Sequence, residues 1–436
     1  MRNGVHRRKN ISAVKLGADA VKVLVFGAGV IGTAAAYYLN RAGHEVTVIE
    51  RNAGAGLETS FANGGIVSAF TARPWASPEV PRMLVKWFGR QDAPYLFRLR
   101  TDWSQWSWAL KFLRQCTRER FERSQEVSLR LSTYSYGCLK EVREREQIQY
   151  DQRADGVLHL FQTQEELDSA AAAELRHSDS HFHPEIIDMR RAVEIEPAMA
   201  ASSERYAGAL FFPQDESGDA HKFTASLAAA AEHQGVSFRY GVAARRLKAE
   251  DGRIKAVDTN QGPLEADAYV ISLGSFSPLL LRKIGIHVPI YPLKGYSVTI
   301  STDGHHGAPG VAIHEGSRRI VMSRLGNRLR AAGTAELTGY DTSVSASRTQ
   351  AILDVTMALF PECGDATKAE RWAGFRPMTP DCLPILGRTR YPNLYINSGH
   401  GSTGWTYACG SGQVVADLIS DKEPEIDLSG LTADRF

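Results

Sequence analysis

Apolar and polar residues along the chain form patterns that predict strands and helices in turn. The apolar run at residues 21–26 ends at a glycine and predicts a short buried strand. A helix of small residues is predicted over residues 30–42, and the segment HEVTVIE at 44–50 predicts a second strand. Together they make a strand–helix–strand unit of about 30 residues, which is typical of a parallel sheet covered by helices.

The rest of the chain divides into a helical stretch and longer strand-rich stretches. Residues 74–150 show helical spacing and are rich in aromatic and basic side chains. Further strands are predicted from Gly156, from Ala207, from Val236, at 268–274, repeatedly over 289–333 and at 393–397, with helices over 223–233, 345–360 and 402–420. Because strand–helix units recur far apart in the sequence, we expect two interleaved domains.

Composition and charge exclude several classes of protein. The 436 residues carry 51 Lys and Arg against 49 Asp and Glu, and 43% of them are hydrophobic. This near-neutral balance disfavours nucleic acid as the main partner, since neutralising phosphates requires a basic excess. No apolar run reaches the roughly 18 residues of a membrane-spanning helix. Five widely spaced cysteines without a C-x-x-C pair indicate reduced thiols and a cytoplasmic protein.

The N-terminal residues 1–20 are basic and polar and have no periodicity. They lack the apolar stretch of a secretory signal. We expect a disordered extension, or a start codon placed too early, with the fold beginning near Val21.

A glycine motif follows the first predicted strand. In G-x-G-x-x-G, Gly27 makes the tight turn, Gly29 lets the backbone approach a pyrophosphate, and Gly32 lets the helix pack on the strand. The helix N-terminus supplies free N–H groups for the phosphates. The sequence therefore predicts a dinucleotide site. Its expected residues are Val23, Leu24, Val25, Phe26, Gly27, Ala28, Gly29, Val30, Ile31, Gly32, Thr33, Ala34, Ala35, Ala36 and Tyr37.

An acidic residue ends the second strand, at the position where a carboxylate binds the adenosine ribose. Glu50 disfavours a 2′-phosphate, although Arg51 beside it weakens that inference. Both residues are expected to contact the dinucleotide. The motif alone leaves NAD and FAD open.

Three other segments carry a more specific resemblance. They are ETSFANGGIVS at residues 58–68, WAGFRPMTPD at 372–381 and NSGHG at 397–401. With the glycine motif, they resemble the FAD-dependent D-amino acid oxidase and glycine oxidase superfamily. PLKGYS at 292–297 and the tryptophan-rich segment after Pro74 are most similar to the D-amino acid dehydrogenase small-subunit branch.

This resemblance implies a fold and a cofactor. The fold class is α/β, with a Rossmann-type FAD-binding domain interleaved with an α+β substrate-binding domain built on a mixed or antiparallel sheet. The FAD-binding domain would comprise residues 21–75, 215–285 and 370–436, and the substrate-binding domain residues 76–214, with a helical insertion, and 286–369. FAD would be bound non-covalently and extended. The resemblance adds Thr59, Ser60, Asn63, Gly64, Gly65, Ala244 and Gly274 as FAD contacts, with Ala244 standing where a Val is usual.

The turn at residues 399–404 joins a strand to the last helix and again presents free N–H groups. Such donors would stabilise negative charge that builds on a flavin during reduction. Gly399, Gly401, Ser402, Thr403 and Gly404 are therefore expected FAD contacts. A simple glycine turn is the alternative.

Three side chains are candidates for substrate chemistry. The resemblance implies that Arg376 binds the substrate carboxylate, for which its planar fork is suited; an ion pair with Asp381 is the alternative. Tyr296 either contacts the carboxylate or packs in the core. His400 is either catalytic or a hydrogen-bonded structural histidine.

The resemblance also implies the reaction. A D-amino acid, D-alanine among them, would transfer a hydride to the flavin, and the imino acid would be hydrolysed to a 2-oxo acid and ammonia. Electrons would pass to a quinone or another non-oxygen acceptor. The alternatives are an oxidase of glycine, sarcosine or hydroxyproline, a non-catalytic FAD electron-transfer subunit, and an NAD-dependent dehydrogenase.

Other signals stay open or weak. Tryptophans 75, 87, 103, 106 and 108 alternate with basic residues and predict either peripheral contact with the inner face of the cell membrane or packing against the flavin domain. The histidines at 177, 181 and 183 lack the partners of a metal site. A covalent flavin link at Cys382 or Cys409 is not expected.

Overall fold

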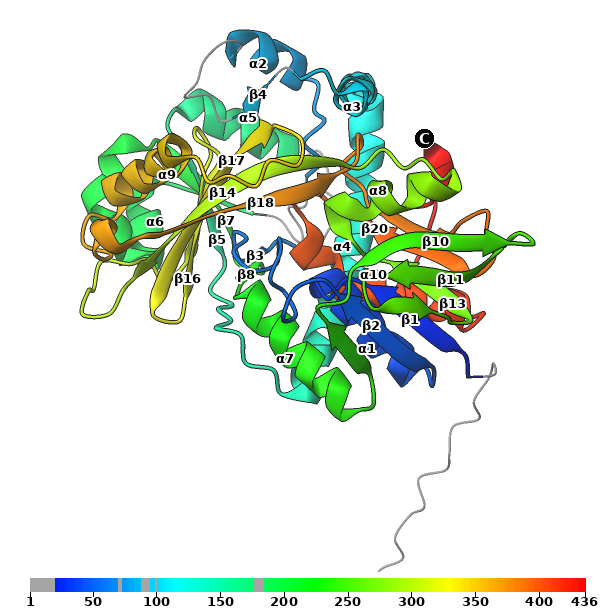
Figure 1. The fold of residues 1–436 in the computed structure, drawn as a ribbon. Coiled ribbons are helices and arrows are strands. Elements are labelled where there is room, and N and C mark those ends of the chain that lie inside the picture. Colours follow the sequence, from blue (N-terminus) through cyan, green and yellow to red (C-terminus); the bar gives the residue numbers. More distant parts are fainter. Residues whose placement is uncertain (1–19, 70–72, 88–94, 99, 176–183) are drawn as a thin grey trace, which may run out of the picture.

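The computed structural model describes residues 20–69, 73–87, 95–98, 100–175 and 184–436. The extension predicted over residues 1–20 lies almost wholly outside this part of the chain, as do the histidines at 177, 181 and 183. Two sheets dominate the described residues (Figure 1).

The first sheet has six strands in the order β19-β20-β13-β1-β2-β9. All pairs are parallel except that of the edge strand β19 with β20. The strands are β1 (Lys22–Phe26), β2 (Glu45–Glu50), β9 (Ser237–Tyr240), β13 (Ala268–Ile271), β19 (Ile385–Arg388) and β20 (Leu394–Ser398). This is the parallel sheet that the strand–helix–strand pattern predicts.

Layers of apolar side chains cover both faces of this sheet. On one face lie α1 (Val30–Arg41), α7 (Ala220–His233) and α10 (Gly404–Ile419), and α4 (Arg118–Glu146) packs on α10. On the other face lies a small antiparallel sheet of β10 (Ala244–Glu250), β11 (Arg253–Thr259) and β12 (Gly262–Leu264). Since the sheet is parallel, the C-terminal ends of β1, β2, β13 and β20 meet at one edge, where ligands of such folds bind.

The second sheet has nine strands and is mixed. Its main path runs β18-β14-β17-β16-β15-β5-β7-β6, and β4 pairs with β17. The strands are β4 (Tyr95–Phe97), β5 (Val157–Phe161), β6 (Glu185–Ile187), β7 (Gly208–Phe212), β14 (Tyr291–Ser301), β15 (Ala312–Glu315), β16 (Ile320–Leu325), β17 (Arg328–Leu337) and β18 (Glu370–Met378). Only β5–β15 and β4–β17 are parallel pairs. Helix α9 (Ala346–Leu359) packs on this sheet. The expected combination of a Rossmann-type sheet with a mixed sheet is confirmed.

The remaining elements are short or peripheral. They are α2 (Val80–Trp87), α3 (Trp103–Gln115), α5 (Gln164–Leu175), α6 (Met189–Ile195), α8 (Ser277–Leu281), β3 (Ile66–Val67), β8 (Glu216–Ser217) and five 3-10 turns at Pro197–Arg205, Gly274–Phe276, Arg282–Ile284, Ala366–Lys368 and Ala433–Arg435. None of the helices in the described part of the chain combines the length and the apolarity needed to cross a bilayer.

Two elements cross the predicted domain boundaries. Strand β18 falls within the segment 370–436 assigned to FAD binding, yet it pairs with β14 along nine residue pairs of the large sheet. Helix α4 falls within the segment 76–214 assigned to the substrate domain, yet it packs against α10. The rest of the predicted division stays a prediction.

Candidate active site

A cavity of about 1650 Å³ lies where the edge of the six-stranded sheet meets the nine-stranded sheet. The loops that follow β1, β2, β13 and β20 line one part of it, and β14, β17 and β18 line another. Cavities for a single small ligand usually measure roughly 300–1,000 Å³. This one has room for a dinucleotide and a second, smaller molecule.

The turn between β1 and α1 is built on the three motif glycines. Gly27 has a φ of +96°, and a Cβ there would lie 2.8 Å from the Ser272 carbonyl oxygen. A Cβ on Gly32 would lie 1.9 Å from the Gly27 carbonyl oxygen. A Cβ on Gly29 would meet only the Ser60 Oγ, at 3.7 Å. Gly27 and Gly32 are thus required by the protein itself, whereas the space at Gly29 opens into the cavity.

Gly29 at the N-cap of α1 has no side chain to cap the helix, so the N–H groups of the first turn other than that of Val30 stay available to a ligand. The Ser60 Oγ accepts a hydrogen bond from the Val30 N–H at 3.1 Å, which draws the loop after β2 onto the helix end. The arrangement is that of an anion-binding helix N-terminus.

Glu50 is buried at the end of β2. Its carboxylate accepts hydrogen bonds from the Ala28 N–H at 2.9 Å and the Asn52 N–H at 2.8 Å. The residue lines the cavity, so its predicted ribose contact remains compatible with these bonds. Arg51 hydrogen-bonds Glu58 through Nε at 3.0 Å and lies over the ring of Phe276.

The predicted cofactor residues separate into two groups. Those that line the cavity are Phe26, Gly27, Gly29, Val30, Ile31, Glu50, Arg51, Thr59, Ser60, Asn63, Gly64, Gly65, Ala244, Gly274, Gly401, Ser402, Thr403 and Gly404. Those that do not are Val23, Leu24, Val25, Ala28, Gly32, Thr33, Ala34, Ala35, Ala36, Tyr37 and Gly399.

Most residues of the second group lie in the core beneath the cavity wall. The side chains of β1 enter the cores on the two faces of the sheet. Helix α1 packs so closely on α10 that a Cβ on Gly412 would lie 2.8 Å from the backbone of Ala34. Helix α1 therefore touches the cavity only at its first turn.

The turn before α10 closes the opposite side. The Gly401 N–H donates to the Pro377 carbonyl oxygen at 3.0 Å, and Gly399 and Gly401 both have positive φ. His400 is buried, and its Nε2 lies 3.2 Å from the Ser411 Oγ. Burial lowers the pKa of His400 to about 3, so the ring is neutral at physiological pH. These contacts favour the structural role for His400.

Several buried polar atoms on the cavity wall have no hydrogen-bond partner among the described residues. They are Ser272 Oγ, Ser275 Oγ, Thr334 Oγ1, Asn397 Oδ1 and Trp405 Nε1. Buried polar groups in proteins are nearly always hydrogen-bonded. Donors and acceptors spread along the wall, with two helix N-termini, fit a long ligand that carries phosphates and a polar ring system such as FAD.

Arg376 extends from β18 into the cavity. A Cβ on Gly295 of β14 would lie 2.1 Å from its Nη1, so the glycine makes room for the guanidinium. Nη1 donates to the Thr334 carbonyl oxygen at 3.0 Å, and Cζ lies 5.5 Å from the centre of the Trp75 ring. Thr334 holds this carbonyl with a φ of +56°, a conformation unfavourable for threonine.

No carboxylate among the described residues neutralises Arg376. Burial lowers its pKa to about 10, so it still carries a charge at neutral pH. The alternative pairing with Asp381 is wrong, because Asp381 pairs with Arg435 at 2.7 Å. A half-buried cation that faces a cavity and has no carboxylate partner among the described residues is suited to bind an anionic ligand.

Comparisons with known proteins decide the family. Residues 22–418 match the family described as FAD dependent oxidoreductase, DAO. The chain belongs to this family. It is 49% identical to a D-amino acid dehydrogenase from Paramagnetospirillum magneticum over 95% of this chain and 99% of the relative, and 44% identical to one from Bradyrhizobium diazoefficiens over 95% and 99%.

Two solved structures share the fold of this chain. Glycine oxidase from Geobacillus kaustophilus superposes with a TM-score of 0.74 at 25% identity, covering 96% of this chain and all of that one. L-proline dehydrogenase from P. horikoshii superposes with a TM-score of 0.75 at 19% identity, covering 96% and 98%. The predicted family and the FAD cofactor are confirmed, and the motif's ambiguity between NAD and FAD is resolved in favour of FAD.

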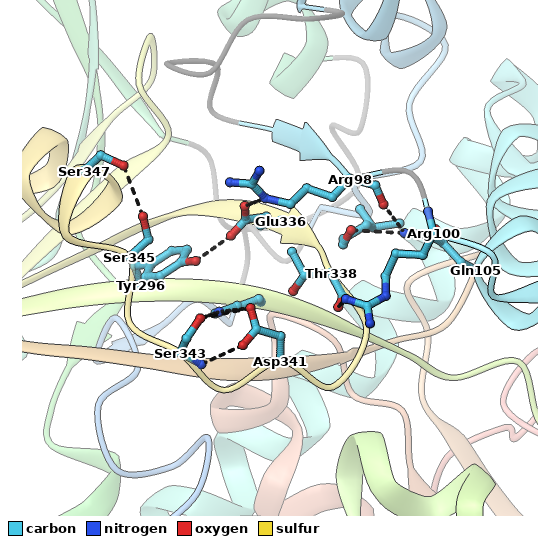
Figure 2. A network of polar contacts seen from close by, with 12 residues as sticks. Arg98, Arg100, Gln105, Tyr296, Glu336, Thr338, Asp341, Ser343, Ser345 and Ser347 are labelled. Atoms are coloured by element: carbon cyan, nitrogen blue, oxygen red, sulfur yellow. Dashed lines mark hydrogen bonds and ion pairs between the residues drawn. The ribbon is translucent and has the colours of Figure 1, made fainter.

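Tyr296 lies on β14 at the cavity, but its hydroxyl group is already engaged. It donates to Glu336 at 2.5 Å, and Glu336 also pairs with the Arg98 Nε at 2.5 Å (Figure 2). Burial and the Glu336 carboxylate both raise the pKa of Tyr296. The network joins the end of β4 to the central strands of the large sheet. Direct hydrogen bonding of Tyr296 to a substrate would require this contact to break.

Tyr296→Phe is therefore expected to act on stability more than on substrate binding. Loss of the donor leaves the buried Glu336 carboxylate with one partner fewer, which costs about 1–3 kcal/mol. Urea unfolding would measure the loss, and steady-state kinetics with a D-amino acid would give KM. A KM raised more than about tenfold with unchanged stability would assign the hydroxyl group to the substrate instead.

The sequence-based reasoning missed other side chains of the wall. Among them are Trp75, Tyr95, His159, Val242, His314 and Arg319. The rings of His159 and His314 lie 4.6 Å apart because β5 and β15 pair in parallel, and burial lowers the pKa of both, that of His314 to about 4. No local motif marks these residues. Only Val242 could have been predicted from the sequence as a cavity residue, because it lies two positions before Ala244, which was predicted to contact FAD.

Neither Cys382 nor Cys409 is among the residues that line the cavity. Within the described ranges no group of histidine, cysteine and acidic residues could hold a metal ion.

Proposed function

We propose that this FAD-dependent oxidoreductase is a D-amino acid dehydrogenase that converts D-amino acids into 2-oxo acids and ammonia. The observation that carries the proposal is the Arg376 guanidinium, which has no carboxylate partner in the described part of the chain and faces a cavity whose other end fits FAD. Relatives that are 42–49% identical over 93–95% of the chain bear the name D-amino acid dehydrogenase, which supports the same reaction.

The residues of the site orient the substrate. Arg376 binds the α-carboxylate through two parallel hydrogen bonds, and the Thr334 carbonyl keeps the fork in place. Trp75 closes over the guanidinium and excludes water from the pair, which strengthens it. FAD, when bound, accepts the hydride from the substrate Cα. The imino acid that remains is hydrolysed by water.

The histidines that the structure places in the cavity wall are not charged acids. His400, His159 and His314 are neutral because burial lowers the pKa of each. A substrate amine that enters unprotonated needs no side-chain base, and the apolar surroundings favour that neutral form. We therefore propose that Arg376 binds the substrate carboxylate. Tyr296 supports the cavity wall through Glu336, and His400 supports the turn before α10.

The proposal extends to the electron acceptor and the location. D-Alanine is the first substrate to test, and a quinone of the respiratory chain is the proposed acceptor. A peripheral position at the inner face of the cell membrane would suit electron transfer to a quinone. The name dehydrogenase among the relatives supports an acceptor other than oxygen. An oxidase acting on glycine is the main alternative, since glycine oxidase shares the fold.

Anaerobic mixing with D-alanine and, separately, with L-alanine tests the function. We expect D-alanine to bleach the visible absorption of the bound flavin and L-alanine to leave it unchanged, because a fixed carboxylate site presents the Cα hydrogen of one enantiomer only. Reoxidation by a soluble quinone analogue should then be faster than by oxygen. A yellow protein bleached by glycine but by neither enantiomer of alanine would contradict the proposal.

A further inference from the structure

Helix α3 presents an apolar face to solvent. Trp103 is 80% exposed, Trp106 41%, Leu110 55% and Leu113 42%. Their spacing of three, four and three residues places them on one face of the helix. Large apolar side chains exposed together in this way mark an interaction surface.

The opposite face of α3 fixes the helix to the protein. Trp108 is buried, and its Nε1 donates to the Met378 carbonyl oxygen at 2.8 Å. Gln105 is also buried and donates to the carbonyl oxygens of Arg98 and Leu337. The exposed side chains are thus held outward by a well-packed helix. Of the tryptophans in this segment, Trp75 and Trp108 face inward, while Trp103 and Trp106 do not.

Helix α2 adds to the same region. Both helices flank β4, since α2 contacts β4 and the Trp106 ring lies 5.6 Å from that of Phe97 (Figure 1). Val85 on α2 is 80% exposed. We use the name α2–α3 face for Val85, Trp103, Trp106, Leu110 and Leu113.

Only basic charges surround the α2–α3 face on its own helices. Helix α2 carries Arg82 and Lys86, helix α3 carries Lys111 and Arg114, and neither helix contains an acidic residue. The acid at the N-cap of α3, Asp102, is occupied by the Ser104 N–H and the Tyr291 hydroxyl. Exposed tryptophans and leucines bordered by lysine and arginine are the composition of a helix that lies in a bilayer interface.

We propose that the α2–α3 face docks the protein on a bilayer containing anionic lipids. The tryptophan and leucine side chains enter the interface, and Arg82, Lys86 and Arg114 lie at the level of the lipid phosphates. The Lys111 Nζ lies over the Phe436 ring instead, 5.8 Å from its centre. The cavity opens beside this face, because Val80 and Met83 of α2 belong to its wall. Docking therefore brings the cavity close to the phase in which a lipid-soluble electron acceptor dissolves. Membrane binding itself does not depend on the proposed D-amino acid dehydrogenase activity.

Flotation of the FAD-loaded protein with vesicles tests this surface. We expect binding to phosphatidylcholine vesicles that contain about 30% phosphatidylglycerol, and about tenfold weaker binding to pure phosphatidylcholine or at high salt. The double variant Trp103→Ser/Leu110→Ser should reduce binding about tenfold or more, and so should Lys86→Glu/Arg114→Glu. Ile186→Ser is the matched control, since Ile186 is 53% exposed but lies on β6.

Activity with a soluble dye as acceptor should be equal in all four proteins, because none of the changed side chains lines the cavity. Absence of vesicle binding by the unchanged protein would overturn the proposal. The proposal would also be overturned if Ile186→Ser lost as much vesicle binding as the two double variants. A dimer in light scattering that Trp103→Ser/Leu110→Ser dissociates, without vesicle binding, would assign the face to a second copy of the chain instead.

Discussion

Arg376→Ala is expected to retain FAD and to lower kcat/KM for D-alanine by about 10²–10⁴-fold. A buried ion pair that loses one partner costs about 3–5 kcal/mol, and each 1.36 kcal/mol is a factor of ten in rate. The substrate carboxylate would enter a desolvated site with no cation to receive it. FAD should stay bound because the residues that fit the dinucleotide come from the six-stranded sheet, the loops that follow its strands and β10, whereas Arg376 comes from β18.

The same variant should leave the substrate-free protein at least as stable. The Arg376 guanidinium has no carboxylate partner among the described residues, and desolvation lowers its pKa to about 10, so the fold gains little from the charge. The hydrogen bond to the Thr334 carbonyl and the contact with the Trp75 ring are lost, and the cost of losing them is set against relief from the uncompensated charge. Urea unfolding without substrate, beside steady-state kinetics, would separate this behaviour from a general loss of structure.

Two comparison variants sharpen the result. Arg371→Ala removes a cation from the same strand. Arg371 is exposed and donates hydrogen bonds to Ala346 and Gln350 of α9, so kcat/KM should change little. Arg376→Lys keeps the charge and loses the fork, so its kcat/KM should fall between those of Ala and Arg. Equal kcat/KM values for Arg376→Ala and the unchanged protein would remove Arg376 from substrate recognition.

The N-terminal strand–helix–strand unit was predictable because its signals are local. Residues 21–50 contain two apolar runs, three glycines at fixed spacing and an acid at the second strand end, and each signal depends only on near neighbours. The predicted helix and strands agree with the observed α1, β1 and β2 within about two residues, the usual uncertainty of such ends.

Strand β18 was not predicted, although it carries the most important candidate side chain. Gly374 and Pro377 indicate a turn, and proline is excluded from the middle of most sheets. In the structure β18 lies at the sheet edge, where a missing N–H donor is tolerated. The role of Arg376 came from family resemblance; that it is unpaired depends on Gly295 and on the Asp381–Arg435 pair, which sequence patterns do not reveal.

The predicted cofactor set was too broad at its start for a geometric reason. A strand turns successive side chains to opposite faces of the sheet, so Val23 and Val25 face one core and Leu24 the other. Only the C-terminal end of β1 and the first turn of α1 reach the cavity. The wall opposite, with Tyr95 and the His159–His314 pair, is assembled by strand pairing between distant segments, for which the sequence contains no local signal.

Gly29→Val is expected to give a folded protein without bound FAD. Gly29 has a φ of −68° and a ψ of 172°, a conformation that valine adopts readily. Its Cβ would meet only the Ser60 Oγ at 3.7 Å, so the protein alone accommodates the branched side chain. That side chain would occupy the space into which the N-terminus of α1 points, where a pyrophosphate is expected. The flavin content after purification should fall to about a tenth or less.

Two glycine variants distinguish loss of the ligand from loss of the fold. At Gly32 a Cβ would lie 1.9 Å from the Gly27 carbonyl oxygen, so Gly32→Ala should disrupt the turn and destabilise the protein itself. Gly137, within α4, has no atom within 4 Å of an added Cβ, and Gly137→Ala should remain yellow and gain up to about 1 kcal/mol.

The comparison requires apoproteins, because bound FAD stabilises the native state by mass action. The free energy of unfolding of FAD-free Gly29→Val should lie within about 1–2 kcal/mol of that of the unchanged apoprotein. A small loss is expected because valine is a poorer N-cap residue than glycine. The flavin absorption per protein should at the same time be nearly lost. A Gly29→Val protein that keeps its colour would mean that the dinucleotide does not approach this turn, and the cofactor contacts proposed along β1 and α1 would then have to be abandoned together.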